Sequence, residues 1–133
     1  MSIDELYIGL EERMSAQFSI EDVKAFASIT KDFNPVHLDP LYASQTIFKD
    51  NIVHGFLVAS LFSAIIGTKM PGEGSIYLKQ DMQFKKPVYI EDLVTAVVLI
   101  TDINYEKRLV MLDTVCYNQH GVEVIKGSAL VKK

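Results

Sequence analysis

The sequence predicts an α+β fold in which one long antiparallel sheet wraps around a single apolar helix. Residues 52–66 are apolar at nearly every position, so a helix there has no face for solvent and belongs in the interior. From residue 75 onward the period of the apolar residues changes from 3.6 to 2, which indicates strands. The loops between the last three runs suit hairpins, so we expect antiparallel pairing.

A short amphipathic helix is expected before the apolar one. Ser19 begins it, with an acid three residues later in a near-match to the capping box. Its apolar residues recur at helical spacing and stop near Lys31. Pro35 and Pro40 then force the residues before them out of the helical region. We therefore expect the segment 32–40 to be a loop that is stiff at both ends.

Four strands should follow the apolar helix, which Gly67 and the next Pro and Gly residues end. The alternating runs are residues 75–84, 92–101, 108–117 and 122–131. The first 17 residues could form a further strand or an ordered arm. No second core, repeat or linker is visible, so residues 1–133 are expected to form a single domain.

Composition and charge exclude several classes of partner. The chain has 49% hydrophobic residues and a net charge of −4, with a pI near 5.3. An acidic protein lacks the general basic surface that binds nucleic acid. No apolar run reaches the ~18 residues that cross a membrane, and the acidic start does not fit a signal peptide. We therefore expect a cytoplasmic protein without nucleic-acid or membrane partners.

Cysteine and histidine spacing gives no sign of a metal site. The single cysteine, Cys116, lies in an apolar run and is expected to be a small core residue rather than a nucleophile. The three histidines, His37, His54 and His120, are scattered along the chain, without the close spacing of most zinc ligands. No metal is expected.

The stretch DFNPVHLDP contains the strongest candidates for chemistry. It places Asp32, Asn34 and His37 within six residues on a stiff loop. Two groups that carry protons can then act on one substrate atom or water. Asn-Pro and Asp-Pro also start ordinary turns, so this stretch alone could be structural.

Together with its surroundings, this loop resembles the MaoC-like hot-dog proteins, and among them the short (R)-specific enoyl-CoA hydratases. The similarity runs from about Phe18 to the C-terminus. The motifs that carry it are D-x-N-P-x-H at 32–37, V-H-G at 53–55, LVASLFS ending at Ser63, PGEGSIYL and MQFKKPVYIEDLVT. The resemblance implies a hot-dog fold and reversible syn addition of water to trans-2-enoyl-CoA, giving (R)-3-hydroxyacyl-CoA in fatty acid metabolism. We expect a short acyl chain, as in crotonyl-CoA, and no cofactor, because coenzyme A is part of the substrate.

The family pattern also implies roles for individual residues. Asp32 and His37 are the expected acid and base, and the Gly55 amide is the expected donor to the enolate oxygen. Asn34 is expected to orient the carboxylate or the water, and His54 to support the pair. Ser63 either shapes the site or bonds back to its own helix. The expected walls of the substrate tunnel are Phe33, Leu38, Leu57 and Phe62, and Lys85 and Lys86 are either solvated or contact the phosphates of coenzyme A.

Three alternative functions are considered beside the hydratase. A hot-dog thioesterase usually has a carboxylate on the central helix, and the sequence has none there. A non-catalytic acyl-CoA-binding protein would need no acid and base together. A 3-hydroxyacyl-ACP dehydratase would need a basic docking patch for its acidic carrier protein, which the net negative charge weakly disfavours.

A homodimer is also expected. A sheet wrapped around one helix has a long exposed edge, and such edges are usually paired or protected. Pairing two identical edges gives a two-fold dimer with a continuous sheet, which agrees with the family habit of a substrate tunnel between subunits.

Overall fold

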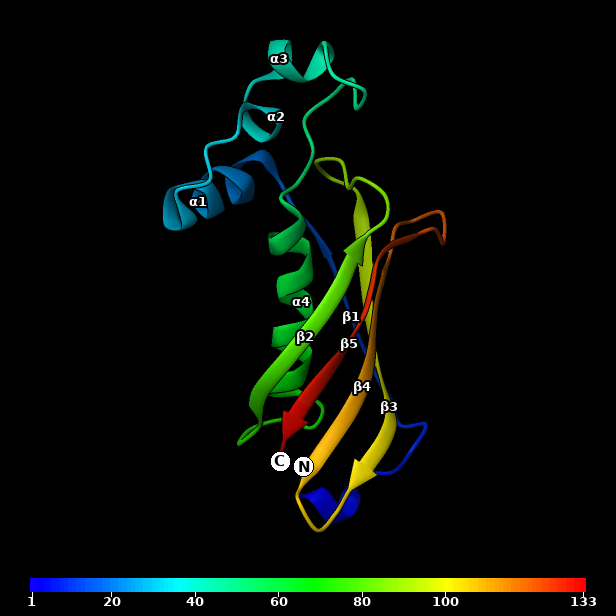
Figure 1. Cartoon of the computed structure of the whole chain (residues 1–133). Coiled ribbons are helices and arrows are strands. Elements are labelled where there is room, and N and C mark those ends of the chain that lie inside the picture. The colour runs from blue at the N-terminus through cyan, green and yellow to red at the C-terminus, as the bar shows by residue number, and fades with distance from the viewer.

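A five-stranded antiparallel sheet curves around one central helix, α4 (Gly55–Thr68), as the sequence predicts (Figure 1). The computed structural model describes residues 1–133. The strands are β1 (Glu11–Gln17), β2 (Ile76–Phe84), β3 (Leu93–Asn104), β4 (Leu109–Tyr117) and β5 (Glu123–Lys132). The other helices are η1 (Ile3–Glu5), α1 (Ile20–Thr30), α2 (Pro35–Leu38) and α3 (Pro40–Ser44). Helices α1, α2 and α3 project beyond the end of the sheet at which α4 begins.

The strand order in the sheet is β1-β3-β4-β5-β2. The predicted hairpins join β3 to β4 and β4 to β5. The first 17 residues contain β1, which pairs with β3 at one edge. Strand β2 does not lie beside its neighbour in sequence, β3, but pairs with β5 at the other edge. Periodicity along the chain could not predict this order, because it depends on contacts distant in sequence.

The apolar helix begins three residues later than expected. Ile52 forms an isolated antiparallel bridge with Tyr89, and the Val53 amide donates to the Val88 carbonyl at 2.7 Å. These residues therefore pair with the chain after β2, and α4 begins at Gly55. Gly67 does not end the helix, which continues to Thr68.

The expectation that this helix has no exposed face is wrong for the single chain. Val58, Phe62 and Ile65 are fully buried against the sheet, within a core cluster of 23 buried residues. The exposed residues of α4 that face away from this core are Phe56, Ser60, Ser63 and Gly67. Their spacing of three to four residues makes them one stripe, because the sheet covers only part of the helix surface.

Edge strand β2 is also more exposed than its alternating pattern predicts. Ile76, Leu78 and Phe84 are 55%, 50% and 50% exposed. The strand lies at the end of the sheet, so one of its long sides has no neighbouring strand.

No helix is long and apolar enough to cross a membrane.

Candidate active site

The segment 32–40 is not the irregular loop expected from its prolines, because each proline begins a short helix. Pro35 is the first residue of α2 and Pro40 the first of α3, a position at which the missing amide costs nothing. The Asn34 side chain caps α2 by accepting from the Val36 amide at 3.2 Å. Upstream, Ser19 caps α1 as predicted, and Lys31 ends it with a left-handed φ of 69°. These caps place Asp32 between α1 and α2.

His37 is buried, and its tautomer follows from its partner. Its Nδ1 lies 2.7 Å from the Ile52 carbonyl oxygen, which can only accept, so Nδ1 carries the proton. Nε2 is left with a free lone pair. Burial is the main cause that lowers the pKa of His37 below its ordinary value of 6.5, with a further lowering by His54; the Ile52 bond and Asp32 act in the opposite direction. The imidazole is therefore suited to accept a proton near neutral pH.

His54 connects this loop to the start of α4. It is 2% exposed and stacks on His37, with ring centroids 3.8 Å apart and 26° between the planes. Its Nε2–H donates to the Asp32 carbonyl at 3.1 Å, and the Phe26 ring contacts it in an edge-type arrangement, with 4.9 Å between the ring centroids. Its Nδ1 is buried without a partner. The ring thus ties the backbone of Asp32 to the residue that precedes α4.

The predicted acid and base are close in space. One side-chain oxygen of Asp32 and one ring nitrogen each of His37 and His54 lie within 4.8 Å of one another. A water that makes hydrogen bonds of ~2.8 Å to two such atoms can bridge this span. Asp32 is exposed whereas both rings are buried, so the carboxylate faces the side from which a substrate or water can enter.

Gly55 occupies the first position of α4. Its amide makes no hydrogen bond within the chain, as expected for the first amides of a helix. The ring of Phe84 lies so close that a β-carbon on Gly55 would come within 2.5 Å of it. Only glycine allows this approach without displacing the ring. The free amide therefore remains accessible at the positive end of the helix dipole.

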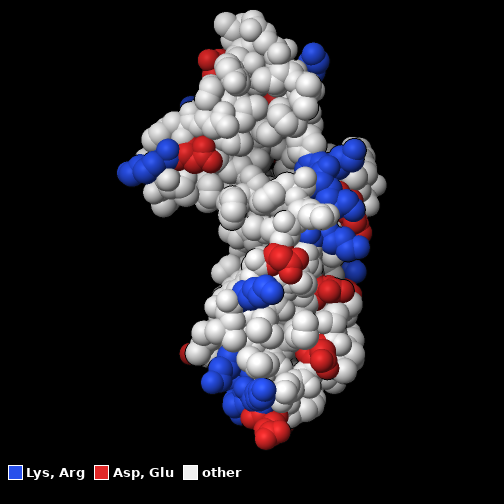
Figure 2. All heavy atoms as spheres, viewed as in Figure 1, with Lys and Arg blue, Asp and Glu red and all other residues white.

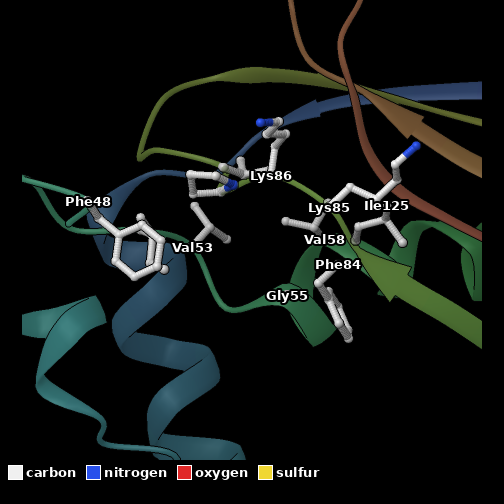
Figure 3. A pocket seen from close by; sticks show the side chains of 11 residues that line it. Phe48, Val53, Gly55, Val58, Phe84, Lys85, Lys86 and Ile125 are labelled. Atoms are coloured by element: carbon white, nitrogen blue, oxygen red, sulfur yellow. The ribbon is translucent and has the colours of Figure 1, made fainter. Parts of the chain in front are cut away.

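A cavity of about 260 Å³ lies beside Gly55 (Figure 3). Its walls come from the chain before α4, from α4 itself, from the end of β2 with the loop that follows, and from β5. They are Phe48, Ile52, Val53, Gly55, Val58, Phe84, Lys85, Lys86, Pro87, Val88 and Ile125. Ile52 both lines this cavity and supplies the carbonyl that fixes His37, so the acid-base pair and the cavity share one segment.

The predicted orienting residue Asn34 contacts the expected catalytic carboxylate differently from the expectation. Its side-chain amide caps α2, and its backbone amide donates to Asp32 Oδ1 at 3.3 Å. The Asn34 side chain therefore does not orient the Asp32 carboxylate in this structure; the Asn34 backbone amide contacts it instead.

The four residues predicted to line the substrate tunnel differ in burial and do not share one cavity. Phe33 is 60% exposed, Leu38 and Leu57 are half-buried, and Phe62 is fully buried in the core. None of these four lines the cavity beside Gly55. Phe62 borders a second cavity of about 280 Å³ between α4 and β2.

Ser63 borders the same second cavity, together with Tyr77 and Gln80 of β2. Its hydroxyl does not bond back to its own helix, whereas the hydroxyls of Ser60 and Thr68 do. Of the two roles considered for Ser63, the structure thus lacks the helix bond and places the side chain at a cavity.

Sequence reasoning missed three contributors to the site. The Ile52 carbonyl has no side-chain signature at all, because any residue supplies a carbonyl. The stacking of His54 on His37 joins positions 17 residues apart by tertiary packing. Phe84 lies in a motif that was noted for its resemblance, but only the fold brings its ring to Gly55.

Comparison with known proteins gives consistent results. A family model described as "MaoC like domain" matches residues 9–119. The chain is 46% identical to an (R)-specific enoyl-CoA hydratase of Aeromonas caviae, over 99% of this chain and 98% of that protein. It is 40% identical to a mitochondrial 3-hydroxyacyl-[acyl-carrier-protein] dehydratase of Arabidopsis thaliana, over 93% and 75%. The solved structure of an (R)-hydratase from A. caviae superposes with a TM-score of 0.93, covering 96% of each chain at 46% identity.

Proposed function

Because the chain belongs to the MaoC-like hot-dog family, we propose that it is an (R)-specific enoyl-CoA hydratase. It adds water reversibly across the double bond of trans-2-enoyl-CoA to give (R)-3-hydroxyacyl-CoA. The observation that carries this proposal is that a carboxylate oxygen of Asp32 and a ring nitrogen of His37 lie within 4.8 Å of each other. The chain that holds them is 46% identical over nearly its full length to a hydratase.

Asp32 and His37 act together on one water. As one O–H bond of the water breaks, its oxygen bonds to the β-carbon, and its proton passes to the pair. The pair delivers a proton to the α-carbon, so atoms and charge balance over the reaction. Both groups come from one short segment and lie on one side of the substrate, so the addition is syn. General acid-base assistance of this kind typically contributes ~10²–10⁴-fold.

The Gly55 amide stabilises the negative charge that develops on the thioester oxygen. The charge arises because nucleophilic attack at the β-carbon moves electrons through the α-carbon onto the carbonyl. A free amide at a helix N-terminus is oriented for this oxygen before the reaction begins, and such preorganised donors often contribute more to the rate than any other catalytic group.

We infer that the reaction needs no metal or redox cofactor. The thioester carbonyl is itself the electron sink. The two imidazole rings of His37 and His54 are stacked with only 26° between their planes, so their lone pairs lie in nearly parallel planes and do not converge on one ion. These nitrogens are therefore better suited to proton transfer and support than to metal binding.

A short acyl chain fits the space beside Gly55. The cavity there, about 260 Å³, is smaller than the roughly 300–1,000 Å³ of most small-molecule sites. Part of the pantetheine arm must share it with the acyl group. We propose crotonyl-CoA as a representative substrate.

We further propose a cytoplasmic homodimer that acts in fatty acid metabolism. Edge strand β2 has no neighbouring strand along one side of its backbone, where a second copy can pair. Its apolar residues Ile76, Leu78 and Phe84 are also exposed in the single chain. Cys116 is free and buried, which fits a reducing compartment, and burial raises its pKa to about 12, so the thiol stays protonated. Sedimentation during catalysis tests the dimer; a monomer with full activity would contradict it.

The proposed activity is tested with crotonyl-CoA. We expect loss of the enoyl-thioester absorbance and formation of (R)-3-hydroxybutyryl-CoA, identified by chiral chromatography. Release of free thiol without hydration would instead identify a thioesterase. Binding of crotonyl-CoA without either reaction would identify a non-catalytic acyl-CoA-binding protein, and hydration of crotonyl-ACP alone would favour the carrier-protein dehydratase.

A further inference from the structure

The cavity beside Gly55 has two lysines in its wall. Lys85 and Lys86 follow β2 directly and line this cavity. In Figure 3 the amino groups of both side chains point away from Gly55 and out of the cavity. Gly55 and the two lysine amino groups therefore lie on different sides of the same cavity.

These lysines belong to a local cluster of positive charge. Lys126 of β5 lies nearby, since it pairs in register with Gln83, two residues before Lys85. Figure 2 shows Lys and Arg side chains gathered over this end of β2 and β5. Glu123 is the one carboxylate paired within the cluster, with its Oε2 2.9 Å from Lys85 Nζ.

The cluster is not neutralised by the chain itself. Lys86 and Lys126 form no salt bridge. In the one ion pair, the side chains of Lys85 and Glu123 are 42% and 33% exposed. Three lysines and one glutamate leave two positive charges at this rim, in a chain whose net charge is −4. A local field of opposite sign to the net charge attracts an anionic ligand to that place.

We propose that Lys85, Lys86 and Lys126 form a binding rim for the phosphate end of a pantetheine thioester. This inference rests on the proposed function, because the thioester must reach Gly55 while its pantetheine arm leaves through the cavity. Phosphates then emerge at the rim, where lysines bind them as point charges. The phosphate that adjoins pantetheine is common to coenzyme A and to acyl carrier protein, whereas the adenosine bisphosphate is found only in coenzyme A.

The first test compares two substrates with the same acyl group. Crotonyl-CoA carries the phosphates and crotonyl-N-acetylcysteamine does not. In the variant Lys86→Glu/Lys126→Glu we expect the ratio of kcat/KM for crotonyl-CoA to kcat/KM for the truncated thioester to fall at least about tenfold, mostly through KM. High salt should reduce this difference, because it screens exposed charges.

Lys107→Glu/Lys132→Glu is the matched control, because it carries the same number of Lys→Glu substitutions as the test variant. Lys132 is exposed at the end of β5, where it pairs in register with Leu109. Lys107 lies in the turn between β3 and β4, at the opposite end of the sheet from the start of α4 (Figure 1). Each glutamate substitution changes the net charge equally, so the control reports any effect of net charge alone. We expect the substrate ratio to stay within twofold. An equal fall in the control, or an unchanged ratio in Lys86→Glu/Lys126→Glu, would overturn the proposal.

A second test does not depend on activity. Calorimetry measures binding of 4′-phosphopantetheine and of adenosine 3′,5′-bisphosphate to the native and Lys86→Glu/Lys126→Glu proteins. Loss of both in the variant supports a rim for either source, and loss of only the bisphosphate supports coenzyme A alone. Unchanged binding of both probes in a protein that hydrates crotonyl-CoA would reject the rim and keep the hydratase. Lysine-dependent binding in a protein without hydratase activity would keep the rim and reject the proposed reaction.

Discussion

The two sides of the active site are held in place by different forces. Asp32 and His37 lie on the projecting part of the molecule that contains α1, α2 and α3 (Figure 1), and side-chain hydrogen bonds to backbone atoms fix them. His37 is bonded to the Ile52 carbonyl, and the Asp32 carbonyl to His54. Gly55 instead belongs to α4, whose residues Val58, Phe62 and Ile65 are packed into the core.

Because of this difference, substitutions can change the activity and the stability of the protein separately. The acid-base side uses side chains that can be replaced without opening the core. The helix side uses a backbone amide, which no substitution removes, so it can only be obstructed or displaced. Substitutions on the two sides should therefore give different combinations of lost activity and changed stability.

The largest expected effect comes from the acid-base pair itself. Asp32→Asn and His37→Gln should each lower kcat by ~10²–10⁴-fold, because each removes a group that transfers a proton. Asp32 is exposed, so Asn should leave the melting temperature nearly unchanged. The double variant should lose little more than the worse single variant, since groups that act as a unit are not additive. Steady-state kinetics with crotonyl-CoA and thermal unfolding provide the measurements.

Asp113→Asn is the control for the carboxylate. Asp113 is exposed on β4, away from the site, and its loss should change kcat less than twofold. If Asp32→Asn behaves like this control, the assignment of Asp32 is wrong.

His54→Phe should lower activity while preserving stability. Phenylalanine keeps a ring on His37 but loses the bond to the Asp32 carbonyl, and a misplacement of about 1 Å can cost ~10²-fold in rate. We expect kcat to fall by about 10–100-fold with little change in KM. The lost hydrogen bond costs about 1 kcal/mol, but removing the unpartnered Nδ1 relieves a penalty of about 1–3 kcal/mol.

The free energy of unfolding should accordingly stay level or rise in His54→Phe, as urea denaturation can measure. His120→Phe, in the exposed turn before β5, serves as the control. A large loss of stability with normal kcat in the folded fraction would mean that His54 is structural only.

Gly55→Ala should obstruct the site at the start of α4 and lower the activity by a smaller factor. The new methyl group would lie within 2.5 Å of the Phe84 ring, which is half exposed and can move. We expect kcat/KM to fall about tenfold, equivalent to 1.4 kcal/mol. The loss caused by Gly55→Ala should be smaller in a Phe84→Ala background, and a double-mutant cycle measures this coupling. Equal losses in both backgrounds would show that Phe84 is not the obstacle.

The pH dependence should show the smallest effect. The proposed acid-base pair requires a neutral His37, so acid should inactivate the enzyme by protonating this ring. Because burial lowers the pKa of His37 from 6.5, kcat/KM should remain high below pH 6.5 and fall only at more acidic pH. A kinetic midpoint above 6.5 would contradict the burial that this structure assigns to His37.

Stability should follow the same imidazole with a defined sign. The unfolded chain binds this proton near pH 6.5, and the folded chain only at lower pH. The free energy of unfolding should therefore decrease as the pH falls from 6.5 toward the folded pKa. His37→Gln should lack this component, which urea denaturation at several pH values can detect.

Sequence patterns predicted the local elements and pointed to candidate side chains for the reaction, but not the contacts between distant segments. Apolar spacing indicated the central helix, and motif spacing indicated Asp32, His37 and Gly55. The start of α4 was misplaced, because the bridge between Ile52 and Tyr89 competes with helix formation and leaves no local signal. The place of β2 beside β5 depends on pairing across the sheet, and the tautomer of His37 depends on a carbonyl 15 residues away.

The central claim is that Asp32 and His37 act from one face of the substrate, and hydration in D₂O tests it most directly. The configuration of the deuterium at the α-carbon relative to the hydroxyl at the β-carbon can be read by NMR of the isolated (R)-3-hydroxybutyryl product. We predict that deuterium and hydroxyl are added to the same face. Addition to opposite faces would require acid and base groups on both sides of the substrate and would contradict the account.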